Sequence, residues 1–371
     1  MRGSESREAP GSESKSPVGP NRKPRLLDQL RGQLRMRHRS LSTERSYVGW
    51  VKRFIFFHDV RHPQEMGKEE VEAFLNHLAM DLGVAASTQN QALNALVFLY
   101  RYVIDKEIGQ LSELIRAKRP ARLPVVMTVD EVERVLECLS GDSLAVCLLL
   151  WGGGLRLMEA LRLRVQDVDF DRRELRVRDG KGRRDRLTVL PERVTDMLRD
   201  KIAVSLLLHR QDLTRGHGEV ELPDALARKY PKAGWEPRWQ WIFPADRMSV
   251  CARTGRVGRH HVFQTTIQRH VRRAARDADM TKHVTPHTFR HSFATALLES
   301  GYDIRTVQEL LGHRSLNTTM VYTHVLNRGG RGVMSPADLA RPRTRSGTKL
   351  RTEPRTRSRD ESPRTQWPDS S

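Results

Sequence analysis

Cysteine is scarce in this chain of 371 residues, which has only Cys138, Cys147 and Cys251. An odd number of cysteines without a C-x-x-C pair argues against a disulfide framework and against a cysteine-based zinc site. Long apolar runs are also missing, since the run at residues 143–155 is well short of the roughly 20 residues that a membrane span needs. Residues 1–20 contain no apolar stretch typical of a secretory signal. We therefore expect a cytoplasmic protein with reduced thiols and no membrane partner.

Acidic residues are also in deficit. The chain has 65 Lys and Arg against 45 Asp and Glu, which gives a formal net charge of +20. A field of this sign attracts polyanions, so nucleic acid is the first class of partner to consider and a membrane surface the second. Aromatic residues make up only 6% of the chain, so a local concentration of them is informative.

Apolar periodicity divides the chain into two domains with two tails. Residues 1–22 and 337–371 are rich in Ser, Pro and charged residues, and we expect both tails to be disordered. Apolar residues spaced by three and four predict four amphipathic helices in residues 23–117. Prolines and weak periodicity indicate a linker at residues 118–127. The second domain is expected at residues 128–336.

The second domain begins with a helix signal and contains one strand signal. Thr128 followed by Glu131 forms a capping-box pattern, which predicts a helix start. Within residues 167–190, the segments ELRVR and RLTVL alternate apolar and polar residues on either side of DGKGRRDR, which is typical of a β-hairpin. The fold class is therefore α+β: a four-helix N-terminal domain followed by a mostly helical domain with a small antiparallel β-hairpin or sheet.

The first predicted helix and the residues after it carry a run of arginines. Together with the high net charge, this run indicates contacts with a phosphate backbone, although it could also be an ordinary solvated face. These arginines are Arg31, Arg35, Arg37 and Arg39.

A cluster of polar residues stands out near the end of the second domain. Pro286 can begin a helix, on which His287 and Arg290 fall on one side, away from the apolar stripe. The next predicted helix ends at LGH, which places His313 on a glycine corner, and Tyr322 follows nine residues later. Alone, a histidine is more often structural, and a tyrosine more often belongs to the edge of a core.

Two further cations complete an ordered series. Arg156 lies in GGGLRLMEAL and Lys181 in DGKGRRDR, upstream of the H-x-x-R, LGH and Tyr elements. In this order, the elements resemble the tyrosine recombinases, or phage-type integrases, over roughly residues 25–335. The resemblance implies an N-terminal core-binding domain and a catalytic domain that cleaves single strands through a 3′-phosphotyrosine. It also implies a tetramer on DNA, and neither a metal nor another cofactor.

The chemistry of the cations suits that reaction. Attack on a phosphodiester accumulates negative charge on the non-bridging oxygens, which Arg156 and Arg290 can hold with bidentate bonds. His313 is expected to donate one more hydrogen bond to them. Glu159 is a candidate for supporting Arg156.

The nucleophile and the proton carriers follow from the same comparison. Tyr322 is expected to attack the phosphorus, and because a phenol is weakly nucleophilic at neutral pH, His287 is expected to assist it. Lys181 is expected to protonate the leaving 5′-oxygen. His291 is expected to be structural.

An insert at about residues 209–258 suggests a subtype. The amino-acid sequence of this insert, together with GRHHV after it, closely resembles the extra segment of integron integrases. This resemblance implies recognition of bases that protrude from a folded single-stranded cassette site. Flat aromatic rings beside cations suit base stacking, and packing of the tryptophans into the domain core is the alternative. The candidate DNA contacts here are Lys232, Trp235, Arg238, Trp239, Trp241, His260 and His261.

Three alternatives remain. The first is a recombinase that acts only on double-stranded sites, such as a phage integrase or a chromosome-dimer resolvase. The second is a catalytically silent DNA-binding regulator, which would need neither the tyrosine nor the arginine clamp. The third is a zinc site at His283, His287 and His291, but Pro286 interrupts the helix and no glutamate accompanies the histidine pair.

Overall fold

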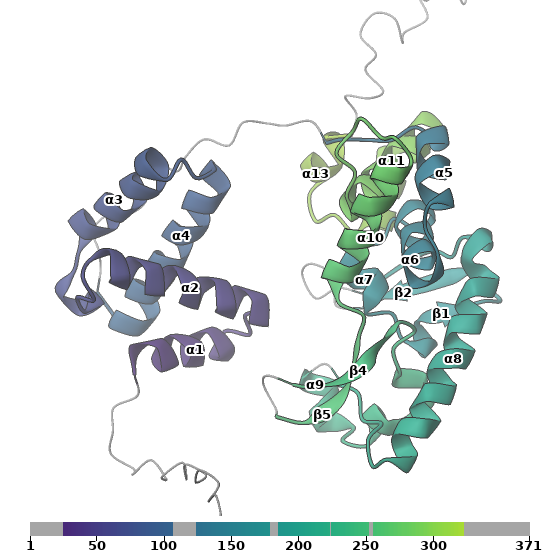
Figure 1. The fold of residues 1–371 in the computed structure, drawn as a ribbon, viewed down its shortest axis with the longest axis horizontal. Coiled ribbons are helices and arrows are strands. Elements are labelled where there is room, and N and C mark those ends of the chain that lie inside the picture. Colours follow the sequence, from purple (N-terminus) through teal and green to yellow (C-terminus); the bar gives the residue numbers. More distant parts are fainter. Residues whose placement is uncertain (1–24, 107–123, 179–184, 223, 252–254, 323–371) are drawn as a thin grey trace, which may run out of the picture. The chain divides into compact units, whose positions relative to one another are not determined.

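The chain forms two compact units, Met1–Arg122 and Leu123–Ser371, in a computed structural model (Figure 1). The boundary between them falls inside the segment 118–127, where we expect the linker. No helix in the described ranges is both long and apolar enough to cross a membrane. The residues that the structure describes are 25–106, 124–178, 185–222, 224–251 and 255–322.

The first unit is a bundle of four helices, as its periodicity predicts. Apolar residues spaced by four, such as Leu30 and Leu34, are fully buried and meet Phe54 and Leu96 in one core. Ser40 begins the second helix by accepting a hydrogen bond from the backbone N–H of Thr43 at 3.1 Å. The helices are α1 (Leu26–Met36), α2 (Leu41–Phe57), α3 (Lys68–Asn76) and α4 (Ala86–Leu99).

The second unit is built around one buried helix. Helix α6 is apolar on nearly all sides, and it packs against α5, α7, α10 and α11 (Figure 1). The early helices of the unit are α5 (Val129–Glu137), α6 (Gly141–Gly152), α7 (Leu157–Leu161), α8 (Thr195–Thr214) and α9 (Asp224–Lys229). The later helices are α10 (Gln264–Asp277), α11 (Pro286–Glu299), α12 (Ile304–Leu311) and α13 (Leu316–Met320).

The predicted capping box and hairpin are both present. The hydroxyl of Thr128 accepts from the backbone N–H of Glu131 at 3.2 Å, and the Glu131 carboxylate accepts from the backbone N–H of Thr128 at 2.8 Å. Strands β2 (Glu174–Val177) and β3 (Arg186–Val189) pair antiparallel, and β1 (Val168–Asp169) adds a third strand beside β2. The hairpin is therefore confirmed and extended to a three-stranded sheet.

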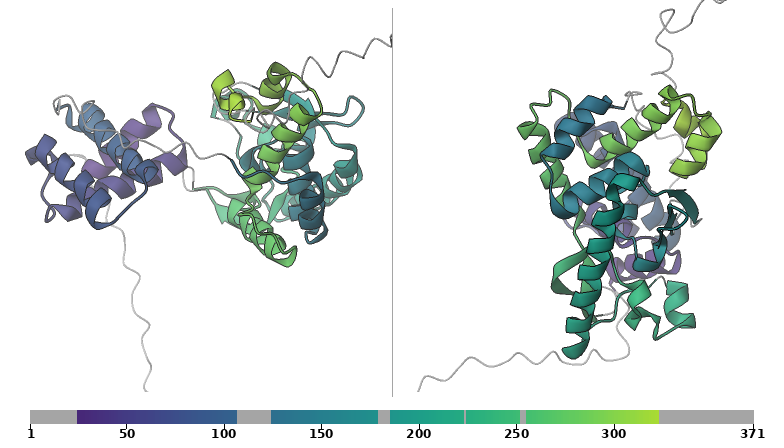
Figure 2. Two further views of the ribbon diagram at one scale, coloured as in Figure 1. Left: turned by 90° about the horizontal axis from the view of Figure 1, so that it is seen from above. Right: turned by 90° about the vertical axis from the view of Figure 1, so that its right-hand side faces the viewer.

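A second sheet lies in the region where the sequence shows little periodicity. Strands β4 (Pro244–Val250) and β5 (Val257–His261) pair antiparallel, with an irregular register between Pro244 and Met248. That irregularity and the polar residues of β4 remove the alternation from which a strand is predicted. Helix α8 runs along one side of the unit toward this sheet, and the carboxylate of Asp212 on α8 binds Arg259 of β5 at 2.6 Å (Figures 1 and 2).

The buried helix α6 supplies a stability prediction. Leu149 is fully buried, so Leu149→Ala should lower the free energy of unfolding of the second unit by about 2–5 kcal/mol, through lost transfer energy and a residual cavity. Chemical denaturation measures this quantity. Leu207→Ala, at a side chain of α8 that is 56% exposed, is the matched control and should change stability by less than about 0.5 kcal/mol. Similar losses in both variants would contradict a core centred on α6.

Candidate active site

Four segments of the second unit bring together four of the predicted catalytic residues. Arg156 is the N-cap of α7, Arg290 lies on α11, His313 follows α12 and Tyr322 follows α13. Arg290 contacts His313 directly, and Glu159 connects Arg156 to Arg290. Lys181 lies outside the described residues.

Arg290 is the most deeply held cation of the cluster, with 3% of its surface exposed. Its guanidinium donates to the backbone oxygens of Gly154 and of Leu311, the latter at 2.6 Å, and to Nε2 of His313 at 3.1 Å. Burial lowers the pKa of Arg290 to about 9, and the nearby charge of Arg156 acts in the same direction. The side chain therefore remains a cation at neutral pH.

Two glycines make these close approaches possible. Gly154 has a φ of +63°, and a Cβ there would lie 2.4 Å from the ring of Phe293. Gly312 ends α12 with a φ of +62°, and a Cβ there would lie 2.7 Å from the side chain of Arg186. Both positions need the left-handed backbone and the missing side chain of glycine. The glycine corner predicted from LGH is thus present.

Glu159 connects the arginines. Its carboxylate accepts from Arg156 at 2.6 Å and from Arg186 at 2.7 and 3.1 Å, and one of its oxygens lies 3.7 Å from Nη1 of Arg290. Burial alone would raise the pKa of Glu159, but the bonds to Arg186 and Arg156 outweigh it and lower the pKa to about 2. The contact with Arg156 agrees with the expected supporting role.

Sequence reasoning missed Arg186. It stands at the start of β3, one residue after the basic segment GKGRR, and nothing in the sequence distinguishes it from the arginines of that segment. In the fold its side chain is 10% exposed, and its Nε donates to the backbone oxygen of Leu310 at 2.9 Å. Arg186 therefore joins Glu159 to the end of α12.

His313 has both ring nitrogens engaged. Nε2 accepts from Arg290 at 3.1 Å, and Nδ1 is 3.0 Å from the hydroxyl of Thr319. Burial and the charges of Arg290 and Arg156 lower the pKa of His313 to about 4, so the ring is neutral at pH 7. We expected this histidine to donate to a phosphate oxygen, and in this structure Nε2 instead faces a cation.

Tyr322 is held by a different histidine from the one we expected. Its side chain packs among Phe293, Val307 and Leu311, it is 3% exposed, and burial raises its pKa. Its hydroxyl oxygen lies 2.8 Å from Nδ1 of His291. His291, which we expected to be structural, is therefore the histidine that contacts the predicted nucleophile.

His287 lies one helical turn before His291 and is exposed. Within the described ranges, no hydrogen bond joins it to Tyr322, although the rings of His287 and His291 lie 6.4 Å apart. The sequence places both histidines on α11, but helical spacing does not reveal which of them reaches the segment after α13.

Two tryptophans of the insert do not lie at the surface, where we expected them to stack on bases. Trp239 and Trp241 are 7% and 6% exposed, and they pack in a small core with Val220. The guanidinium of Arg164 lies 3.7 Å from the ring centre of Trp241 and donates to the backbone oxygen of Trp239 at 2.6 Å. Because both rings are buried, neither has an exposed face on which a base could stack. The alternative, packing of the tryptophans into a core, is therefore correct for these two.

Trp235 differs from its neighbours. Its side chain is 39% exposed, while its backbone oxygen lies 3.1 Å from Nε2 of His209. Lys232 and Arg238 close to it are exposed, and Arg238 pairs with Glu236. These three residues retain surfaces that a nucleic acid could reach.

The two histidines after the insert, His260 and His261, also differ in how deeply they are buried. His261 is 2% exposed and bonds through Nδ1 to the backbone oxygen of Val262 at 2.7 Å, and burial lowers its pKa to about 3. His260 is half-buried and stacks with the exposed ring of Phe263. Of the pair, only His260 lies near the surface.

The arginines of the first unit take part in local contacts. Arg31 pairs with Asp28 at 2.8 Å, and Arg35 binds Glu44 through two hydrogen bonds. Arg37 lies 4.0 Å from the ring centre of Tyr102, and Arg39 is exposed. Their contact with DNA stays a prediction.

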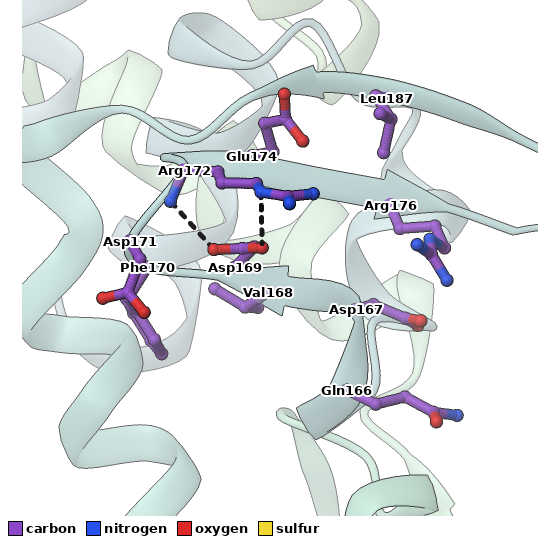
Figure 3. A pocket seen from close by; sticks show the side chains of 10 residues that line it. All are labelled: Gln166, Asp167, Val168, Asp169, Phe170, Asp171, Arg172, Glu174, Arg176 and Leu187. Atoms are coloured by element: carbon purple, nitrogen blue, oxygen red, sulfur yellow. Dashed lines mark hydrogen bonds and ion pairs between the residues drawn. The ribbon is translucent and has the colours of Figure 1, made fainter.

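A hollow of about 470 Å³ lies beside β1 and β2 (Figure 3). Asp169 forms part of it and binds the backbone N–H of Arg172 at 2.8 Å. None of the residues that line it belongs to the arginine and histidine cluster. The cluster is therefore separate from this hollow.

Comparisons with known proteins identify relatives of both units. Residues 125–328 match the Phage integrase family, and residues 26–110 match the phage integrase N-terminal SAM-like domain. Two proteins named Integrase/recombinase, from Escherichia coli and Pseudomonas aeruginosa, are each 50% identical over 329 residues, which is 89% of this chain and 98% of the relative.

Among solved structures, a lambda integrase dimer bound to a COC′ core site matches with a TM-score of 0.55. The identity is 16%, and the match covers 82% of this chain and 95% of that chain. At this identity, the likeness supports the fold alone.

The Glu159 contacts predict a pH-dependent contribution to stability. A carboxyl whose pKa is lower in the folded state stabilises the fold above its unfolded pKa, and this contribution is lost as the pH falls toward the folded pKa. Lowering from 4.5 to about 2 corresponds to roughly 3 kcal/mol. Glu159→Gln should therefore unfold more easily at pH 7, and the difference from the parent should shrink between about pH 5 and pH 2.

Chemical denaturation at several pH values measures this difference. Glu192→Gln is the control, because its carboxylate pairs with Arg173 but is 79% exposed. A Glu159→Gln difference that stays constant from pH 7 to about pH 2 would show that the carboxylate charge is not what stabilises the cluster.

Proposed function

Since this chain belongs to the phage integrase family and is a site-specific DNA recombinase, we propose that Tyr322 is the nucleophile that cuts its DNA. The phenol oxygen forms a bond to phosphorus, and the bond from phosphorus to the 5′-oxygen breaks. The leaving oxygen takes a proton, for which we assign Lys181 as the donor. The 3′-phosphotyrosine retains the energy of the broken bond, so a 5′-hydroxyl can rejoin the strand.

The observation that supports this proposal is the arginine cluster beside the tyrosine. Arg290 contacts His313, whose ring lies 6.3 Å from that of Tyr322, centre to centre. Through Glu159 the cluster also includes Arg156, whose side chain is 23% exposed against 4% for Arg290. Arg156 is therefore the more accessible of the two cations that we assign to the phosphate oxygens.

Trapping of a covalent complex tests this assignment. On a nicked suicide substrate, from which the cleaved end diffuses away, the parent protein should accumulate a DNA adduct that resists denaturing electrophoresis. Tyr322→Phe removes only the hydroxyl, so it should bind DNA with unchanged affinity and form no adduct. Tyr302→Phe, at a side chain that is 55% exposed, is the matched control and should form the adduct normally. Adduct formation by Tyr322→Phe would contradict the assignment.

We further propose that the DNA sites include integron cassette sites, read as folded single strands as well as double strands. This subtype is supported by the resemblance of the insert and by the exposed side chain of Trp235 beside Lys232 and Arg238. An exposed ring between cations suits the stacking of a protruding base. We propose that four copies assemble on paired sites in the cytoplasm.

Trp235 supplies the test of the subtype. If its ring stacks on a protruding base, Trp235→Ala should weaken recombination of folded single-stranded cassette sites by about 5-fold to 150-fold, equivalent to about 1–3 kcal/mol. Binding to a plain double-stranded site should change much less, and the melting temperature should stay close to that of the parent. Equal losses on both substrates would favour a recombinase that acts only on double-stranded sites.

Trp241→Ala is the contrast within the same insert. Because its ring is buried against Arg164, removal should cost about 3–5 kcal/mol of stability and depress both activities together.

A further inference from the structure

The hydroxyl of Tyr322 is in contact with a second histidine, His291, to which no role in cleavage has been assigned. Tyr322 and His291 lie in different segments, and the only hydrogen bond of the Tyr322 hydroxyl within the described ranges goes to Nδ1 of His291, at 2.8 Å. The two ring centres are 5.6 Å apart. The 2.8 Å separation between the hydroxyl oxygen and Nδ1 is suitable for direct transfer of a proton between the two groups.

We propose that His291 is a catalytic residue, which accepts the proton of the Tyr322 hydroxyl as the phenol oxygen attacks the phosphate. This inference rests on the proposed function, because it requires Tyr322 to be the nucleophile. The bond between the phenol oxygen and phosphorus forms, the proton moves from that oxygen to Nδ1, and the bond to the 5′-oxygen breaks. In the rejoining step, the His291 imidazolium returns the proton to Tyr322.

The charges around His291 keep its ring neutral before DNA binds. His287 and Arg290 flank it on α11, while Tyr322 and His313 face it from the segments after α13 and α12. Burial, followed by the charges of His287 and Arg290, lowers the pKa of His291 to about 4. A neutral ring that accepts the phenol proton at Nδ1 carries its own hydrogen on Nε2.

DNA binding changes this balance in the direction that the reaction needs. A phosphodiester held by Arg290 places a negative charge beside one of the cations that depress the pKa of His291. The pKa of His291 should therefore rise when the substrate is bound. A neighbouring imidazolium also becomes more stable as charge accumulates on the phosphate oxygens.

His291→Asn tests the proposal, because the amide oxygen can still accept a hydrogen bond near the position of Nδ1 but is too weak a base to take the proton. Single-turnover cleavage of a suicide substrate should slow by at least about 100-fold, the lower end of what a general base contributes. DNA binding and melting temperature should remain close to those of the parent. His283→Asn, at an exposed histidine before α11, is the matched control and should cleave at the parental rate.

A second substrate separates the two proton transfers. In a 5′-bridging phosphorothiolate the leaving atom is sulfur, which departs without being protonated. A variant that lacks only the leaving-group acid should recover on this substrate, whereas His291→Asn should stay slow. Recovery of His291→Asn would overturn the proposal, since it would place His291 on the leaving-group side.

The pH dependence gives a readout that a purely structural role would not change. A tyrosine that loses its proton to hydroxide needs no general base, so the cleavage rate of His291→Asn should climb about tenfold per pH unit from pH 7 toward pH 9. The parent should be nearly independent of pH over that range. If His291→Asn unfolds, His291→Gln is measured in the same way.

The outcomes separate this inference from the proposed function. An adduct formed by Tyr322→Phe would refute the proposed function itself. An inactive Tyr322→Phe together with parental cleavage by His291→Asn, or a slow His291→Asn without the alkaline recovery, would refute the role of His291 alone.

Discussion

The carboxylate of Glu159 holds the rest of the site together. Without it, the guanidiniums of Arg156, Arg186 and Arg290 would repel one another in a region of low polarity. With it, Arg156 and Arg186 are joined by hydrogen bonds of 2.6 and 2.7 Å to a side chain that is only 9% exposed. Because Arg186 also bonds to the backbone oxygen of Leu310, the same carboxylate positions the end of α12. The corner that carries His313 therefore depends on an ion cluster rather than on apolar packing alone.

One carboxylate among three arginines leaves a net positive charge, and that excess has two effects. It gives the proposed phosphate-binding arginines a fixed arrangement in the absence of DNA. It also combines with burial to lower the pKa of His313 and of His291 to about 4. The histidines of the cluster are therefore neutral at pH 7, and the cationic role belongs to the arginines. A neutral histidine is available as a hydrogen-bond or proton acceptor, which suits its position beside Tyr322.

The sequence predicted those features that depend on local order. The capping box at Thr128, the β2–β3 hairpin and the glycine corner at Gly312 follow from patterns within a few residues, and the structure contains all three. The missed features depend on which way a side chain points. Arg186 and His291 occupy positions that spacing could not separate from their neighbours, because the segments that they contact lie far away in the sequence.

The core of the insert also depends on contacts that the sequence does not reveal. Arginine usually lies at the surface, so a tryptophan cluster near cations suggested stacking on nucleic acid. Instead Arg164 is 5% exposed, held by the backbone oxygens of Trp239 and Glu221 at 2.6 Å each. Burial lowers the pKa of Arg164 to about 10, so it stays charged. A buried cation of this kind needs the surrounding carbonyls and rings, which come from segments more than fifty residues away.

Arg164 also connects the insert to the three-stranded sheet. Its backbone N–H donates to the carboxylate of Asp167 at 3.1 Å, and the same carboxylate binds Arg178 at the end of β2. The guanidinium of Arg178 lies 5.3 Å from the ring centre of Trp239. The core of the insert and the strand that leads toward Lys181 are therefore anchored on the same carboxylate. For this reason, disruption of the buried tryptophans should also disturb the sheet, whereas a substitution at Trp235, which lies outside this network, should leave the sheet unaltered.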